Sequence, residues 1–247
     1  MTKFDFNTIY NEDCLEGMKR IPDKSVDMVC CDLPYGMTNN KWDIVIPMEK
    51  LWEEYKRVLK DNGVVVLFGN QPFTSYLVMS NLEWFKYSLV WEKNKFSDFM
   101  NAKRKPLKIH EDILVFYKST PTYNPQFTDG EPYVRWNTQE SVDRQTNYGK
   151  LKANVVNNDG KRYPTTVLKF DRVETPQHPT QKPVKLIEWL IKTYTNEGET
   201  VLDNCMGSGT TAEACINTGR NYIGFETDEK YYENSLKRIN MLANPLF

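Results

Sequence analysis

Short apolar runs rich in β-branched residues alternate along the chain with longer amphipathic segments. This alternation is typical of a sheet whose parallel strands are joined by helices. Seven strands are predicted, at residues 4–10, 26–31, 63–69, 85–91, 112–118, 200–203 and 222–225. Helical periodicity is clearest at residues 48–59, 183–194, 210–218 and 230–242. The pattern therefore predicts an α/β fold with a mostly parallel, seven-stranded sheet.

The alternation fades between residues 119 and 176, where Pro, Asn, Thr, Tyr and Asp dominate. We interpret this stretch as a small inserted region with little core of its own. Its polar and aromatic side chains suit contacts with base edges and phosphates, and Arg135, Arg144 and Arg162 are the candidates. A long irregular surface loop is the alternative that composition leaves open.

Composition and charge place the chain among ordinary globular proteins. Apolar residues make up 40% and charged residues 26% of the 247 residues, which favours neither disorder nor a membrane protein. The net charge of −1 argues weakly against a protein that coats nucleic acid. One segment differs, because six basic residues face the single acid Asp98 there, and they could meet phosphates: Lys93, Lys95, Lys103, Arg104, Lys105 and Lys108.

The N-terminus has neither the basic flank nor the apolar core of a signal peptide, and no run approaches the ~18 apolar residues of a spanning helix. We therefore expect a cytoplasmic protein. Its five cysteines lack metal-ligand spacing, and Cys30 and Cys31 should face opposite sides of a strand. His110 and His178 have no ligand cluster beside them, so no metal is expected.

The first candidate loop is Asp32-Leu33-Pro34-Tyr35-Gly36, which follows the predicted strand 26–31. Open α/β sheets bind ligands at the carboxyl ends of their strands, where this turn would lie. A carboxylate and a backbone carbonyl both accept hydrogen bonds from an amino group, and a tyrosine offers a face for a planar ring. Pro-Tyr-Gly is also an ordinary turn, so both interpretations stay open at this point.

The second candidate loop, residues 203–211, follows the predicted strand 200–203 and contains Gly207-Ser208-Gly209. Glycines at a strand-to-helix turn let a ligand approach the backbone and the N–H groups of the helix. Glu226 ends the next strand, about 20 residues further on, where an acid could hold ribose hydroxyls. The loop predicts a nucleoside cofactor without separating a nicotinamide dinucleotide from another nucleoside.

Both loops resemble motifs of the amino-methylating DNA methyltransferases. Residues 32–36 are similar to the D-P-P-Y motif of that family, and residues 203–211 are similar to its D-x-F-x-G-S-G-T motif. Two further signatures match, His-Pro-Thr-Gln-Lys-Pro at residues 178–183 and the set Trp91-Glu92-Lys93, Asn101-Ala102-Lys103 and His110-Glu111. Because the catalytic motif precedes the cofactor motif, the chain is identified as a member of the circularly permuted β group.

The resemblance implies a Rossmann-like methyltransferase fold of circularly permuted order. Residues 1–118 would form the catalytic half, 119–176 an inserted target-recognition region, and 177–247 the cofactor-binding half. The implied reaction is site-specific transfer of a methyl group from S-adenosylmethionine to adenine N6 of a base flipped out of double-stranded DNA. Whether the protein works alone, as a homodimer or beside a cognate restriction enzyme stays open.

The resemblance also implies roles for the residues that match. Asp32 and the Leu33 carbonyl would accept the amino group of the base, with Pro34 fixing the turn and Tyr35 stacking on the base. Cofactor contacts are expected from Asp13, Thr180, Lys182, Asp203, Cys205, Gly207, Ser208, Gly209, Thr210 and Glu226. Thr180 and Lys182 would meet the methionine carboxylate and Asp203 its ammonium group. Asp13 would meet the cofactor adenine, or equally serve as the N-cap of a helix that begins at Cys14.

The chain departs from the family pattern at two places. Leu33 stands where the family usually has Pro, which should be mild because the role there belongs to the backbone carbonyl. Asn204 and Cys205 replace the usual Pro and Phe, which puts cofactor affinity rather than reaction type in question.

Four rival functions compete with adenine N6 methylation. The family tends to use Ser at the Asp32 position for N4-cytosine, so Asp favours adenine and leaves cytosine as the nearest alternative. Cytosine C5 methylation needs a cysteine after a proline, and no cysteine here follows one. A nicotinamide-dependent oxidoreductase or an inactive DNA-binding homologue is more distant.

Overall fold

The computed structural model describes residues 5–36, 43–139, 152–175 and 181–243, which form two compact units. The first unit comprises Met1–Asn124 and Thr166–Phe247, and the second comprises Pro125–Thr165.

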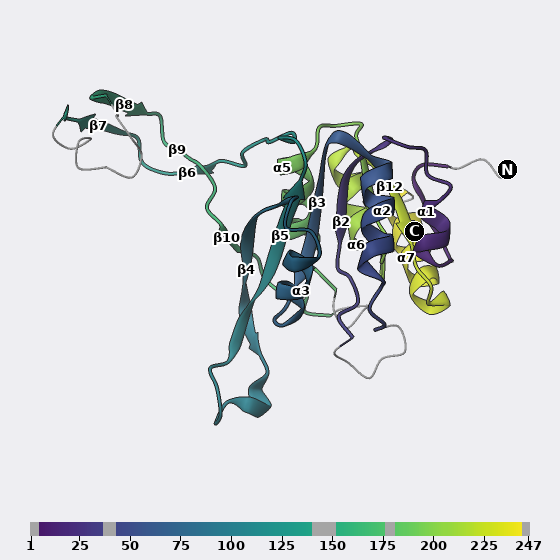
Figure 1. The fold of residues 1–247 in the computed structure, drawn as a ribbon. Helices are drawn as coiled ribbons and strands as arrows, with labels where there is room; N and C mark the ends of the chain where they lie inside the picture. Colours follow the sequence, from purple (N-terminus) through teal and green to yellow (C-terminus); the bar gives the residue numbers. More distant parts are fainter. Residues whose placement is uncertain (1–4, 37–42, 140–151, 176–180, 244–247) are drawn as a thin grey trace. The chain divides into compact units, whose positions relative to one another are not determined.

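An eight-stranded sheet organises the first unit (Figure 1). Its strands in spatial order are β1 (Thr8–Tyr10), β12 (Asn221–Phe225), β11 (Thr200–Asp203), β2 (Val26–Cys31), β3 (Leu59–Gly69), β5 (Lys108–Tyr117), β4 (Phe85–Ser97) and β10 (Val167–Lys169). Only β5 runs antiparallel to its neighbours, so the sheet is mixed but mostly parallel. The predicted α/β class is therefore confirmed.

The predicted number of seven strands is wrong by one. The eighth strand, β10, has three residues and pairs with β4 at the edge of the sheet. It lies inside residues 119–176, where three residues are too few to show an alternating pattern. Strands β4 and β5 are also longer than predicted, because both continue beyond the end of β3.

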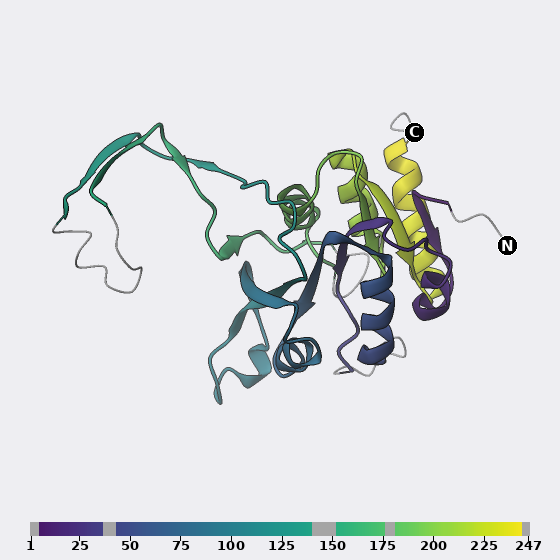
Figure 2. The same cartoon turned by 45° about the horizontal axis from the view of Figure 1, so that its top comes forward.

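Helices cover both faces of the sheet, as Figure 2 shows. One core cluster joins one side of the strands to α1 (Cys14–Met18), α2 (Met48–Val58) and α3 (Phe73–Ser80). A second cluster joins the other side to α5 (Val184–Tyr194), α6 (Thr210–Thr218) and α7 (Glu229–Ala243). Cys31 belongs to the first cluster and Cys30 to the second, which confirms that the two thiols face opposite sides.

The strands β2, β3, β11 and β12 are parallel, so their C-terminal ends lie along the same edge of the sheet, the edge that runs across the strands. The last residue of β3, Gly69, pairs with Asp112 of β5, and Asp112 pairs with Val90 of β4. Residues after Val90 and before Asp112 therefore project past this edge (Figure 1). We call residues 94–109 the arm; a 3-10 helix, η1 (Phe99–Asn101), lies within it.

The second unit consists of two short antiparallel pairs. Strand β6 (Thr128–Asp129) pairs with β9 (Lys161–Arg162), and β7 (Tyr133–Asn137) pairs with β8 (Asn154–Asn158). Most of its described residues are exposed, including Trp136 at 73%, so this unit has little core. This unit, Pro125–Thr165, is shorter than the expected insertion 119–176 that contains it. Strand β10 falls within 119–176 but belongs to the main sheet.

Within the described ranges, no helix combines the length and apolar character needed to cross a membrane.

Candidate active site

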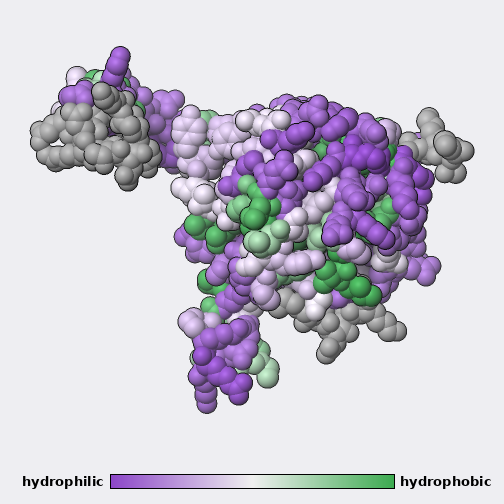
Figure 3. Space-filling view, in the orientation of Figure 1, coloured by the Kyte–Doolittle hydropathy of each residue, from purple (hydrophilic) through white to green (hydrophobic). Residues whose placement is uncertain are grey.

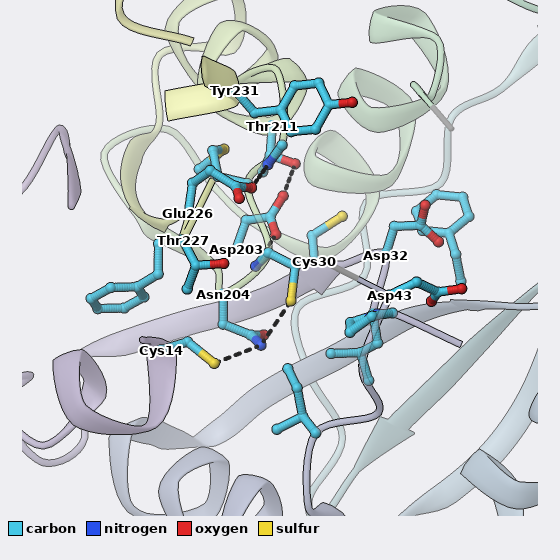
Figure 4. A pocket seen from close by; sticks show the side chains of 18 of the residues that line it. Cys14, Cys30, Asp32, Asp43, Asp203, Asn204, Thr211, Glu226, Thr227 and Tyr231 are labelled. Carbon is cyan, nitrogen blue, oxygen red and sulfur yellow. Dashed lines mark hydrogen bonds between the residues drawn. The ribbon is translucent and has the colours of Figure 1, made fainter. Parts of the chain in front are cut away.

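A cavity of about 430 Å³ lies in the first unit, and both candidate loops line it (Figure 4). We call residues 32–36 the acceptor loop and residues 203–211 the glycine loop. The two loops meet because β2 and β11 are parallel neighbours, with Leu202 opposite Val29, so their carboxyl ends leave the sheet side by side. Ligand pockets typically measure roughly 300–1,000 Å³. The cavity is thus large enough for a small molecule between the loops.

The carboxylate of Asp32 is engaged on both oxygens. The Tyr35 hydroxyl donates a hydrogen bond of 2.7 Å to Oδ1, and the Lys182 ammonium donates to Oδ2. The Tyr35 ring packs against Phe73 with its centroid 4.8 Å away. The backbone N–H of Gly36 donates to Asp43, which closes the turn from the other side. These contacts hold the acceptor loop in place at the C-terminal end of β2.

Two further charged side chains stand behind Asp32. Lys182 also lies 3.3 Å from Oε2 of Glu111, and Lys93 forms an ion pair with Oε1 of Glu111. Burial alone would raise the pKa of Glu111, but the charges of Lys182 and Lys93 lower it to about 2. Burial raises the pKa of Asp32, Lys182 opposes that rise, and Glu111 adds to it.

The glycine loop is organised around Asp203. Its Oδ2 accepts a hydrogen bond of 2.6 Å from the Thr211 hydroxyl, and its Oδ1 accepts one of 3.0 Å from the Cys205 N–H. Burial raises the pKa of Asp203 to about 6, and these hydrogen bonds oppose the rise. Opposite it, Glu226 accepts the Gly207 N–H at 2.8 Å. Two carboxylates therefore line the same end of the cavity (Figure 4).

Side chains from two helices support the glycine loop, and the sequence did not reveal them. Tyr55 of α2 donates a buried hydrogen bond to Asn204, which in turn contacts the thiols of Cys14 and Cys205. Arg238 of α7 donates to the backbone oxygen of Ser208 at 3.2 Å. Such supports involve residues far apart in the chain, so no local motif signals them.

Most of the predicted cofactor residues line the cavity: Asp13, Lys182, Asp203, Cys205, Gly207, Ser208, Thr210 and Glu226. Asp13 also caps α1, accepting the Leu15 N–H at 2.9 Å, so both of its expected positions are compatible with the structure. Gly209 does not line the cavity; its φ of +83° and its closeness to Ser235 of α7 are what require glycine. Thr180 lies outside the described residues.

The contacts of Lys182 differ from the expected one with a methionine carboxylate. Its ammonium group is buried between the carboxylates of Asp32 and Glu111 and lies over the Phe68 ring. The prediction missed Glu111 as a residue of this site, although the His110-Glu111 pair belongs to a recognised signature.

The basic segment needs one correction. Lys93 is buried and paired with Glu111, so it is not part of an exposed basic surface. Lys95, Lys103 and Arg104 are exposed on the arm, whereas Lys105 pairs with Asp98 and Lys108 is partly buried. In the space-filling view the arm is largely hydrophilic with a small apolar area (Figure 3). Two apolar residues of the arm, Phe99 and Met100, are 69% and 84% exposed.

The candidate residues of the second unit have different surroundings. Arg135 is exposed, whereas Arg162 stacks on Tyr133 and donates hydrogen bonds within its own hairpins. Arg144 lies outside the described residues.

Among the described residues, no group of three or more His, Cys, Asp or Glu side chains could hold a metal ion.

Comparisons with known proteins define the class. The sequence model of a family described as "DNA methylase" matches residues 26–237. DNA adenine methyltransferase YhdJ of Escherichia coli is 30% identical over 96% of this chain and 84% of its own length. Type II methyltransferase M.HinfI of Haemophilus influenzae is 27% identical over 97% of this chain and 70% of its own. The protein therefore belongs to the N6/N4 DNA methylase family and is a DNA methyltransferase.

Solved structures agree with this assignment. The M1.HpyAVI–SAM complex has a TM-score of 0.66 and 26% identity, covering 94% of this chain and 98% of that one. PvuII DNA methyltransferase, described as cytosine-N4-specific, has the same TM-score of 0.66 at 16% identity, covering 94% of this chain and 85% of that one. The second likeness concerns the fold alone. The mostly parallel sheet is thus that of the DNA methyltransferases.

The raised pKa of Asp203 predicts a pH-dependent stability. Because the pKa of Asp203 is higher in the folded state, its protonated form stabilises the fold. This contribution to stability is complete at pH values below the ordinary pKa of 3.8 and is lost as the pH rises through about 6. Asp203→Asn removes it, so the stability of the wild type relative to this variant should be about 1 kcal/mol greater at about pH 5 than at about pH 7.5. Urea unfolding at both pH values measures the difference. An equal difference at both would contradict an elevated pKa.

Proposed function

We propose that this protein transfers a methyl group from S-adenosylmethionine to adenine N6 in DNA, acting on a base turned out of the duplex. The observation that carries the proposal is the shared cavity: the acceptor loop lies on one side and the glycine loop with Glu226 on the other. A target amine is inaccessible inside a duplex, so the base must leave the stack, at a cost of roughly a few kcal/mol.

The residues of the cavity suit this cofactor. The carboxylates of Asp203 and Glu226 line the cavity. Their oxygens would accept hydrogen bonds from an ammonium group and from ribose hydroxyls of a bound ligand. Cys14, Met206 and Phe225 add apolar surface for the remainder. We assign cofactor contacts to Asp203, Glu226 and the backbone of residues 205–208 and Thr210. When bound, S-adenosylmethionine supplies an electrophilic methyl group on a sulfonium.

The acceptor loop would prepare the amine. An exocyclic amine is a weak nucleophile because its lone pair is delocalised into the ring. Hydrogen bonds from that amine to Asp32 and to the Leu33 carbonyl would favour a more tetrahedral nitrogen, and Tyr35 would support the base by stacking. Asp32 need not be a strong base, because the proton can leave after transfer. Alignment supplies much of the remaining rate, on the order of 7–11 kcal/mol in well-oriented systems.

Two features support adenine over cytosine. Asp32 occupies the position where the family tends to have Ser in N4-cytosine enzymes. YhdJ, the relative at 30% identity, is named as an adenine methyltransferase. N4-cytosine methylation is the alternative, and the likeness of the fold to a cytosine-N4-specific enzyme favours neither base.

We assign DNA contacts to the arm and to the second unit. The arm projects past the edge of the sheet where the cavity lies, and it exposes Lys95, Lys103 and Arg104. The second unit exposes Arg135 and Trp136, side chains suited to phosphates and bases. Within the expected insertion 119–176 it is the candidate for target recognition.

Methyl transfer tests the proposal directly. Incubation with tritiated S-adenosylmethionine and unmethylated amplified genomic DNA should label the DNA, and mass spectrometry of the digest should show N6-methyladenine. Asp32→Asn should lower the rate by more than about 100-fold because the acceptor for the amine is weakened, with cofactor affinity nearly unchanged. Asp27→Asn is the matched control, since Asp27 lies at the other end of β2 and also pairs with a lysine. N4-methylcytosine in the digest would overturn the base assignment, and undiminished transfer by Asp32→Asn would remove Asp32 from the mechanism.

The arm should determine part of the salt dependence of DNA binding. Each phosphate contact contributes about 0.9 to the slope of log affinity against log salt, so Lys103→Gln with Arg104→Gln should reduce that slope by up to about 1.8. Fluorescence anisotropy with a labelled duplex at several salt concentrations measures it. Lys230→Gln with Lys237→Gln on α7 serves as the control, because α7 packs beside β1 at the opposite side of the sheet. An equal reduction in both double variants would leave the arm without a special role.

A further inference from the structure

Four charged side chains of alternating sign form a continuous line beneath the acceptor loop. Lys93 on β4 contacts Glu111 on β5, Glu111 contacts Lys182 before α5, and Lys182 contacts Asp32 after β2. The side chains of Lys93 and Lys182 are each 8% exposed, Glu111 is 16% exposed and Asp32 is 21% exposed. Their charges sum to zero, which is what allows them to be buried together.

Strand register explains how the line forms. Cys31 pairs with Leu67 of β3, and Gly69 of β3 pairs with Asp112 of β5. Asp32 and Glu111 therefore lie just past the same edge of the sheet, with β3 between their strands. Lys182 lies over the Phe68 ring of β3, 5.0 Å from its centroid, and so bridges the two carboxylates.

The two carboxylates beside Lys182 differ in how well their oxygens are hydrogen-bonded. The Lys182 ammonium donates to Oδ2 of Asp32, while Oδ1 accepts the Tyr35 hydroxyl. Oε1 of Glu111 accepts from Lys93. Oε2 of Glu111 is buried and is the less well engaged oxygen, because the Lys182 ammonium lies 3.3 Å away and is not well aligned for a hydrogen bond to it. Weak engagement of a buried carboxylate oxygen is costly, so Oε2 would gain from a closer contact with Lys182.

The resting pairing conflicts with the role proposed for Asp32. An amine held by Asp32 needs a carboxylate oxygen with high electron density, and a lysine on Oδ2 withdraws that density. Moving the ammonium to Glu111 would free Oδ2 and satisfy Oε2 in the same step. Both oxygens lie within reach of one ammonium group, so a small movement of the end of Lys182 is sufficient.

We infer that Glu111 is a positioning residue that takes over Lys182 from Asp32 when the amine of the target base engages Asp32. Lys93 fixes Glu111 for this exchange by holding Oε1. Because its pKa is lowered to about 2, Glu111 is an anion throughout the working pH range. The inference rests on the proposed function, and it adds a resting state in which the lysine occupies the acceptor carboxylate until substrate arrives.

Glu111→Gln tests the inference through two readouts. With a neutral side chain at this position Lys182 stays on Asp32, so the maximal rate of tritium transfer to unmethylated amplified genomic DNA should fall at least about tenfold. Affinity for S-adenosylmethionine, measured by calorimetry, should change less than about twofold. In a plot of kcat against pH, the acidic limb should also move to lower pH. The negative charge of Glu111 raises the pKa of Asp32, and its removal lowers that pKa.

The groups that act on Asp32 come from several elements. They are Lys182 before α5, Tyr35 on its own loop, Glu111 on β5 with Lys93 of β4 behind it, and three groups that line the cavity, Asp203, Cys30 and Cys205. Only Glu111 is altered in this variant. The direction of the shift therefore reports the charge that was removed.

Two further variants separate exchange of the lysine from a structural role. Glu111→Asp keeps the charge but shortens the reach, so the acidic limb should stay near its wild-type position while the rate falls. In a Lys182→Gln background there is no lysine to exchange, so adding Glu111→Gln should change the rate by less than about twofold. Glu188→Gln on α5 is the control, since Glu188 is also buried and paired with a lysine, and its rate should stay near that of the wild type.

Each outcome decides for or against the inference. The inference would be overturned if Glu111→Gln kept the wild-type rate and the acidic limb of its pH profile did not move. It would also be overturned if Glu111→Gln lowered the rate by the same factor in the wild type and in the Lys182→Gln variant. If Glu111→Gln does not fold, Glu111→Asp with a wild-type rate would overturn it. Absence of transfer by the wild type would instead refute the proposed function, so the two failures are distinguishable.

Discussion

The parallel pairing of β2 with β11 is the constraint on which the site depends. The two strands lie next to each other in the sheet but 170 residues apart in the chain, from Cys31 to Val201. Parallel neighbours end at the same edge, so the acceptor loop and the glycine loop must open into the same space. If either strand lay elsewhere in the sheet, each loop would remain an ordinary turn. Hydrophobic cores on both faces hold these strands in place.

Charge organises the space that this pairing creates. Asp32, Asp203 and Glu226 all line the cavity, and Lys182 is the ammonium group that approaches one of them. Such a cavity suits a positively charged cofactor, which would lower the cost of burying the carboxylates. Lys182 pairs with Asp32 and not with Asp203, so the proposed acceptor side and the proposed cofactor side of the cavity differ in charge.

The sequence predicted the central elements well, since β2, β11 and α6 begin and end at the predicted residues. These segments are buried and have clear patterns. It missed α3, whose apolar residues are distributed around the helix, with Leu77 buried and Met79 67% exposed. Neither loop motif could show that Lys93 is buried or that Glu111 belongs to the site, because both facts arise from the register of β4 and β5.

A crystal structure with S-adenosylhomocysteine bound would show whether the two loops form one methyl-transfer site, because that molecule carries every part of the cofactor except the methyl group. We expect its homocysteine ammonium at Asp203, its ribose at Glu226, and its sulfur toward the Asp32 side of the cavity. Binding outside this cavity, or with the sulfur directed away from Asp32, would show that the two loops do not act together.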